Sequence, residues 1–320
     1  MSKLRPMQRR ALLVSLMPSL RSGDNTTAEE ASRFECVMKN QASQFREDLY
    51  LLPLLLNRTG LHTPGTFVEA GALDGLDSSN TLILERCFDW TGLLVEANPH
   101  NYARLRSSGR RARMVYAALC EGEASNASVE MFLHGGSTAA RADVQNDRTL
   151  LRWHKAWGVG LPEVQPHVLA GCPRGVSPAR CRVRNATVAR DHMRGRGERV
   201  RVGCRGLGSL MAQAGMPRAT FLSLDVEESE EAVMHTFDAA SFEVAVVEAT
   251  NAHAAKDRSV AAMFERAGLR IQARYLYPIF WNQVFVRGEI SPTHNPMLRQ
   301  HLYTSVSTLP RSASAPIISN

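Results

Sequence analysis

The chain has 320 residues, of which 44% are hydrophobic and 22% are charged, and its formal net charge is +7. This composition excludes a disordered or fibrous protein and predicts one main domain, with an extension, around one substantial core. The charge is concentrated in residues 174–205, which hold ten arginines, two acids and no aromatic residue. Stacking on bases needs aromatic side chains, so no nucleic-acid partner is expected. The segment is interpreted as a solvated insertion, with an acidic partner as the alternative.

Two segments precede the main domain. Residues 1–23 carry five basic residues and no acid, with an apolar run at 11–17. This pattern is compatible with a targeting peptide, but no small-x-small cleavage site follows the run. The run is far too short to span a membrane, and we expect no transmembrane segment. Residues 24–64 show helical spacing of apolar residues and predict a helical N-terminal extension that Pro53 interrupts.

Residues 65–290 are predicted to form the main domain. Strands alternate with helices in its first half, which is the pattern of a doubly wound, mostly parallel α/β sheet. The expected strands are 66–70, 92–96 and 114–119, and the expected helices are 79–87 and 99–105. Residues 128–133 alternate like an added hairpin or edge strand.

A long insertion then interrupts the pattern. Residues 135–198 show no sustained period and contain several prolines, so they are expected to form an irregular segment that overhangs a substrate pocket. Regular elements then return. Helices are predicted at 207–214, 231–237 and 259–267, and strands at 220–226, 244–248, 270–275 and 280–286. Residues 291–320 are expected to be a C-terminal tail.

The most informative motif is Phe67-Val68-Glu69-Ala70-Gly71-Ala72-Leu73-Asp74-Gly75, followed one βα unit later by Val95-Glu96-Ala97-Asn98-Pro99. Glycines after a first strand and an acid after the second are typical of a nucleoside-cofactor site. The spacing here is E-x-G-x-x-x-G, which lacks the middle glycine of the pyrophosphate-binding fingerprint. The pattern therefore favours S-adenosylmethionine, which has no phosphate, over a nicotinamide cofactor.

These segments, together with Ser79-Asn80-Thr81 and Phe221-Leu222-Ser223-Leu224-Asp225-Val226-Glu227, resemble the FkbM-type methyltransferases over roughly residues 65 to 287. The resemblance implies a class I methyltransferase fold, with the last two strands paired antiparallel at one end of the sheet. It also implies methyl transfer to a hydroxyl of a sugar or secondary metabolite. One departure concerns activity, because the family has glycine after D-V-E and this chain has Glu228.

The candidate cofactor residues all follow the first two strands. They are Glu69, Gly71, Ala72, Asp74, Gly75, Asn80, Glu96 and Asn98. Glu96 is the candidate ribose acid, whereas Glu69 and Asp74 are expected at the methionyl amino group. The alternative for Asp74 and Asn80 is a turn or helix-cap role.

Asp225 and Glu227 are the candidate catalytic pair, because an acid is costly to bury at a strand end unless it has a partner. One of them would act as the base that removes the hydroxyl proton or would contact the cofactor, and the alternative is a solvent-facing helix cap. In a less favoured alternative, they bind a divalent cation with Glu248 and Asn251. His134 and His253 are alternative bases. No metal ligand is assigned, and the cysteine spacing lacks C-x-x-C, which argues against zinc.

Six cysteines and four N-x-S/T sequons bear on the compartment without deciding it. Cys87 and Cys120 lie in apolar contexts and are predicted to be buried small hydrophobic residues, whereas Cys172 and Cys181 bracket a loop that an oxidising compartment would bridge. The sequons begin at Asn25, Asn57, Asn126 and Asn185.

The alternative to an enzyme is a non-catalytic binding module, because eukaryotic Star-like trafficking proteins share the E-x-G-A-x-D-G and E-A-N-P segments. A nicotinamide dehydrogenase ranks third. The sequence leaves open the small-molecule or glycan acceptor, the compartment and the oligomeric state.

Overall fold

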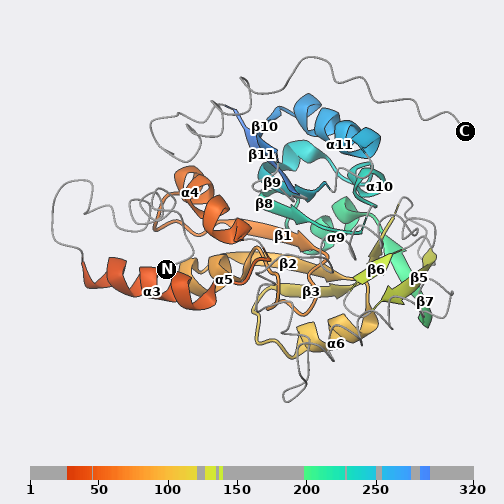
Figure 1. Cartoon of the computed structure of the whole chain (residues 1–320), viewed down its shortest axis with the longest axis horizontal. Coiled ribbons are helices and arrows are strands. Elements are labelled where there is room, and N and C mark those ends of the chain that lie inside the picture. The colour runs from red at the N-terminus through yellow and green to blue at the C-terminus, as the bar shows by residue number, and fades with distance from the viewer. Residues whose placement is uncertain are drawn as a thin grey trace, which may run out of the picture.

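The computed structural model describes residues 27–44, 46–120, 127–134, 137–139, 198–227, 229–249, 254–274 and 282–288. They form a seven-stranded sheet covered by helices on both faces, with a smaller four-stranded sheet beside it (Figure 1). Within these ranges, no helix combines the length and apolar character needed to cross a membrane.

The order of the main sheet is β10-β11-β9-β8-β1-β2-β3. Its strands are β1 (Thr66–Ala70), β2 (Thr91–Glu96), β3 (Arg113–Tyr116), β8 (Ala219–Leu224), β9 (Phe242–Glu248), β10 (Leu269–Arg274) and β11 (Asn282–Arg287). β11 lies antiparallel between β9 and β10, while the pairs from β9 to β3 are parallel. The chain therefore has the predicted mostly parallel, doubly wound α/β sheet, with the predicted antiparallel pair at one end.

Alternate residues of the strands point to opposite faces and build two apolar cores. On one face, Phe67 and Phe221 pack with leucines of α4 (Glu47–Thr59) and with α5 (Leu82–Phe88). On the other face, Val68 and Leu222 pack with helices α9 (Leu207–Gln213), α10 (Glu230–Met234) and α11 (Ala254–Arg266). Strands buried on both faces read as apolar runs, which explains why the sequence revealed their positions. A further helix, α6 (Pro99–Arg106), follows β2.

The N-terminal extension forms two helices. α3 (Ala28–Asn40) begins at Thr27, whose hydroxyl accepts from the amide of Glu30, while the Glu30 carboxylate accepts from the amide of Thr27. Pro53 was expected to interrupt the second helix but lies inside α4, so that prediction was wrong. A proline inside a helix costs roughly 3 kcal/mol. Burial of every residue from Glu47 to Leu56, most of them apolar, offsets that cost.

The predicted third strand, 114–119, is divided in two. β3 ends at Tyr116, and β4 (Ala118–Leu119) instead joins the smaller sheet, in the order β4-β7-β5-β6. The other strands are β5 (Ser128–His134), β6 (Ser137–Ala139) and β7 (Glu198–Arg205). The alternating residues 128–133 therefore form part of a hairpin with β6. The arginine-rich segment 174–205 ends in strand β7. Because β4 follows β3 directly, the small sheet lies beyond the carboxyl end of β3 (Figure 1).

Cys87 and Cys120 were expected to be buried small hydrophobic residues, and that expectation was wrong, because both are half-buried and disulfide-bonded. Cys87 forms a disulfide with Cys36, and Cys120 forms one with Cys204. The partners are far apart in sequence and are brought together by the packing of α3 on α5 and of β4 on β7. Cys172 and Cys181 lie outside the described residues.

Candidate functional site at the carboxyl edge of the sheet

Position 71 requires glycine because the loop after β1 packs closely against the end of β8. Gly71 has φ +84, and a Cβ built there would overlap the carbonyl oxygen of Asp225 at the end of β8. The amides of Gly71 and Ala72 both donate to the carbonyl of Val95, at 3.0 and 3.1 Å, and Ala72 is itself buried. The loop after β1 is thus fixed between β2 and β8, and the Cβ position of Gly71 is occupied by the Asp225 carbonyl.

The rest of this loop is tightly wound. Leu73, Gly75 and Ser78 also have positive φ, of +53, +75 and +59. Such conformations favour glycine, so Leu73 and Ser78 store strain of the kind that concentrates at functional sites. Asp74 has a turn role here, because its Oδ1 accepts from the amides of Leu76 and Asp77 at 3.0 and 2.8 Å.

Glu69 is buried and bonded by the chain itself. Its Oε1 accepts from the amide of Asn80 at 2.8 Å, and its Oε2 accepts from the hydroxyls of Ser79 and Thr81 at 2.9 and 2.6 Å. Burial raises its pKa, while the nearby Arg110 guanidinium and these hydrogen bonds lower it. The carboxylate thus holds the end of the loop in place.

Arg110 forms hydrogen bonds with several groups of the same loop. Its side chain is fully buried and donates to the Glu85 carboxylate, the Gly75 carbonyl and the hydroxyls of Ser79 and Thr81. A buried guanidinium is stable only when its donors are used in this way. Arg110 therefore connects the loop after β1 to helix α5.

Asn80 connects this loop to β8, because its Nδ2 donates to the Ser223 hydroxyl at 3.0 Å. The two residues and Asp225 face a polar hollow at the carboxyl ends of the strands. It is lined by Gln44, Glu47, Ser78, Asn80, Ser223, Leu224, Asp225, Val246 and Asn282. Glu47 is buried and accepts from Asn282 at 2.8 Å. The helical extension therefore supplies one wall of this hollow.

Glu96 ends β2 and is 6% exposed. Its oxygens accept from the amides of Leu73 and Asn98 at 2.8 and 2.7 Å, and Ala97 and Asn101 also donate to it. Burial raises the pKa of Glu96 to about 7, and these hydrogen bonds limit the rise. The candidate ribose acid is thus tied directly to the glycine loop.

Asn98 and Tyr116 are both neighbours of Glu96. Asn98 caps α6, with Oδ1 accepting from the amides of His100 and Asn101, while its buried Nδ2 has no hydrogen-bond partner in the described part of the chain. Tyr116 pairs in register with Glu96 and is 40% exposed. Burial and the Glu96 carboxylate raise the pKa of the Tyr116 hydroxyl. An aromatic face beside an acid suits an adenosine.

The ends of β8 and β9 bring several acids together. Asp225, Glu230 and Glu248 each place one carboxylate oxygen within 4.8 Å of the others, which is the one potential metal-binding group found among the described residues. Burial, and then the carboxylates of Asp225, Glu230 and Glu227, raise the pKa of Glu248 well above its usual value. Its buried Oε2 has no hydrogen-bond partner in the described ranges.

Lys256 of α11 supplies the positive charge of this cluster. Its Nζ bonds the Glu230 carboxylate, whose other oxygen accepts from the amide of Val226 at 3.1 Å. Glu230 is thus satisfied by a lysine, so the donor set does not call for a metal ion. Glu227 has φ +54 and contributes to the electrostatics of Glu248.

Several predicted residues cannot be placed. Glu228, Asn251 and His253 lie outside the described residues, and the side chain of His134 is not described, although its backbone ends β5.

Sequence reasoning missed Arg110, Glu230, Lys256 and Tyr116. Glu230 stood directly before the predicted helix 231–237, which was a usable signal, whereas Tyr116 stood inside the predicted strand 114–119. Arg110 and Lys256 gave none, because a basic residue outside a motif is usually solvated.

No protein-family model and no curated protein matches the chain. Among solved structures, a precorrin-6y C5,15-methyltransferase from Geobacter metallireducens GS-15 is similar at 9% identity, over 73% of this chain and 86% of that chain, with a TM-score of 0.33. A putative O-methyltransferase from Klebsiella pneumoniae is similar at 11% identity, over 89% and 91% of the two chains, with a TM-score of 0.30.

Proposed function

We propose that the chain is an S-adenosylmethionine-dependent O-methyltransferase of the FkbM type that acts on a hydroxyl of a sugar or small metabolite. One observation carries the proposal. In a sheet with the class I methyltransferase strand order, Glu96 and Asp225 end the strands on the two sides of β1. Ligands of doubly wound sheets bind outside the carboxyl ends of the strands, at the point where the strand order reverses. β1 is at that point.

The residues beside β2 and β3 fit an adenosine. Tyr116 offers an exposed aromatic face, and Glu96 offers acceptors for ribose hydroxyls. Because donors already surround Glu96, a ribose hydroxyl would reach it by replacing the amide of Leu73. Cofactor binding is therefore expected to move the loop after β1.

When bound, S-adenosylmethionine supplies an electrophilic methyl group. The chain must then hold the acceptor hydroxyl in line and remove its proton. Asp225 is exposed at the hollow and is assigned as the base, with Glu227 as the second candidate. Asn80, Ser223 and Asn282 line the same hollow and can orient acceptor hydroxyls.

Calorimetric titration with S-adenosylmethionine and S-adenosylhomocysteine tests the cofactor site. We expect the wild type to bind, and Tyr116→Ala and Glu96→Gln to bind at least tenfold more weakly. Glu243→Gln is the matched control, because Glu243 lies near the opposite, amino-terminal end of its strand β9. If the ribose replaces the Leu73 amide at Glu96, hydrogen exchange of that amide should be faster with cofactor than without it. Folded wild-type protein that binds neither compound would refute the proposal.

The catalytic assignment has its own test. Asp225→Asn should retain cofactor binding and lose transfer of a labelled methyl group to a panel of sugars and hydroxylated metabolites. Equal transfer by the variant and the wild type would exclude Asp225 as the base. Addition of a metal chelator should leave methyl transfer unchanged, since Lys256 already supplies a positive charge to the cluster of Asp225, Glu230 and Glu248.

A further inference from the structure

Two cysteine pairs have backbone geometry suited to disulfides. The Cα atoms of Cys36 and Cys87 are 5.7 Å apart, and those of Cys120 and Cys204 are 5.8 Å apart, both near the centre of the range that disulfides adopt. The paired residues are 51 and 84 positions apart in sequence. Local sequence therefore does not bring them together, and two independent coincidences of packing would otherwise be required.

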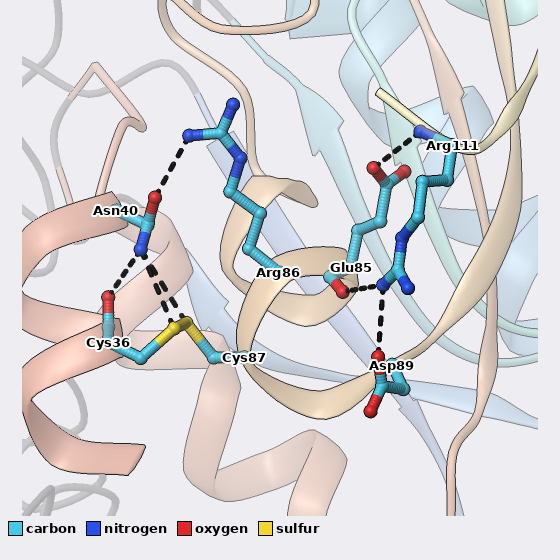
Figure 2. Close-up of a disulfide and its surroundings, with 7 residues drawn as sticks. All are labelled: Cys36, Asn40, Glu85, Arg86, Cys87, Asp89 and Arg111. Atoms are coloured by element: carbon cyan, nitrogen blue, oxygen red, sulfur yellow. Dashed lines mark hydrogen bonds and ion pairs between the residues drawn. A yellow bond between two sulfur atoms is a disulfide. The ribbon is translucent and has the colours of Figure 1, made fainter. Parts of the chain in front are cut away.

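The Cys36–Cys87 disulfide lies in a well-formed interface between α3 and α5 (Figure 2). Asn40 donates from Nδ2 to the Cys36 carbonyl at 2.8 Å and accepts at Oδ1 from Arg86 at 3.0 Å. Its Nδ2 also lies 3.5 and 3.9 Å from the two sulfurs. Val37 is fully buried one residue from Cys36. The sulfurs are thus bridged where the helices already pack.

The Cys120–Cys204 disulfide crosslinks the small sheet at its β4–β7 pair. Cys204 pairs in register with Ala118, and Cys120 directly follows β4, where its amide donates to the carbonyl of Arg205 at 3.2 Å. Cys204 is buried among the apolar residues of the small sheet. No metal-binding group among the described residues includes a cysteine. A structural role therefore accounts for both pairs, and such disulfides persist in oxidising compartments.

A modification signal of the same compartment lies on α4. The sequon Asn57-Arg58-Thr59 occupies the last turn of this helix, and Asn57 is exposed although the preceding residues from Leu49 to Leu56 are buried. A glycan on Asn57 would project into solvent without disturbing the core. The other three sequons begin outside the described residues.

We infer that this chain matures in an oxidising, glycosylating compartment, where it acquires the Cys36–Cys87 and Cys120–Cys204 disulfides and an N-linked glycan on Asn57. Each disulfide forms by thiol–disulfide exchange. Two thiols lose two protons and two electrons, and a disulfide-bearing oxidoreductase is reduced to its dithiol. For the glycan, the Asn57 amide nitrogen bonds to the sugar C1 of a lipid-linked oligosaccharide diphosphate. The bond from C1 to the diphosphate breaks, and the amide loses one proton.

The inference does not depend on methyl transfer. It is tested by expressing the full chain with its own N-terminus in cultured eukaryotic cells and alkylating free thiols at harvest. Non-reducing peptide mapping should recover Cys36 linked to Cys87 and Cys120 linked to Cys204. Enzymatic deglycosylation in heavy-oxygen water should convert Asn57 to a labelled aspartate.

Matched variants separate the two modifications. Thr59→Ala should lose the Asn57 glycan, whereas Thr59→Ser should keep it, because serine preserves the sequon. Cys172→Ser with Cys181→Ser should leave both linked peptides in place. Recovery of all four paired cysteines as alkylated thiols, with Asn57 unmodified in the wild type, would overturn the inference.

Discussion

Gly71 and Asp225 are in direct backbone contact, since a Cβ on Gly71 would overlap the Asp225 carbonyl oxygen. The glycine of the proposed cofactor loop thus packs against the strand end that carries the proposed base. Because the overlap is with backbone rather than with a flexible side chain, moving either segment away would cost considerable free energy. The positions of the loop and of the base therefore depend on each other.

Gly71→Ala is expected to lower the free energy of unfolding by roughly 3 kcal/mol, through overpacking added to the strain of a positive φ. Chemical denaturation measures the loss. The matched control is Gly109→Ala, because Gly109 has φ +73 but a Cβ added there would meet no atom within 4 Å. That variant should lose only about 1 kcal/mol. Equal losses would show that the contact with Asp225 is unimportant.

Arg110→Met should destabilise the fold by roughly 3 to 5 kcal/mol, because it leaves the buried carboxylates of Glu85 and Glu69 without their cation. The neighbouring Arg111 offers the control. Its side chain is 62% exposed and pairs with an exposed Asp89, so Arg111→Met should change stability by about 1 kcal/mol or less. Thermal and urea unfolding of both variants would check this, and similar effects would contradict a special role for Arg110.

Glu96 should make stability depend on pH in a definite direction. Its folded pKa of about 7 lies above the ordinary value of 4.5, so the folded state holds the proton more tightly. Stability from this group is present below about pH 4.5 and is lost as pH rises to about 7. The loss is about 3 kcal/mol in total. Glu96→Gln has no such titration, so its stability relative to the wild type should rise between pH 5 and 8. A difference that stays constant across this range would refute the assignment.

The disulfide between α3 and α5 should contribute substantially to stability. Closing a loop of this length is worth about 4 kcal/mol in the chain-entropy model. The double variant Cys36→Ser with Cys87→Ser should lose that amount in denaturant titrations. Adding reductant should not lower the stability of this variant further through the 36–87 pair, because the variant lacks that crosslink. If the double variant and the oxidised wild type unfold at the same denaturant concentration, the crosslink is not formed or does not matter.

The sequence was most informative about the strands of the main sheet. The first strand was predicted at 66–70 and is Thr66–Ala70, because strands buried on both faces appear as apolar runs bounded by polar turns. Helix interruptions were less reliable. Pro53 is accommodated inside α4 because tertiary burial outweighs its local cost, which no local pattern reveals.

The candidate site was predictable only in outline. The sequence placed Glu96 and Asp225 at strand ends, and the strand order then set them on either side of β1. It left Asp74 between a turn role and a cofactor contact, and the structure gives its carboxylate a turn role. The ion pair of Glu69 with Arg110 could not be predicted, since Arg110 lies outside any motif.

By itself, the sequence determined the alternation of strands and helices and the carboxyl-edge position of the acids, because period and strand direction are local properties of the chain. Only the tertiary structure decided which groups meet. It placed Arg110 under the loop after β1, the Gly71 backbone against Asp225, Lys256 on Glu230, and each cysteine with its partner. These contacts join residues far apart in sequence, and they are fixed by strand order and by the packing of whole helices.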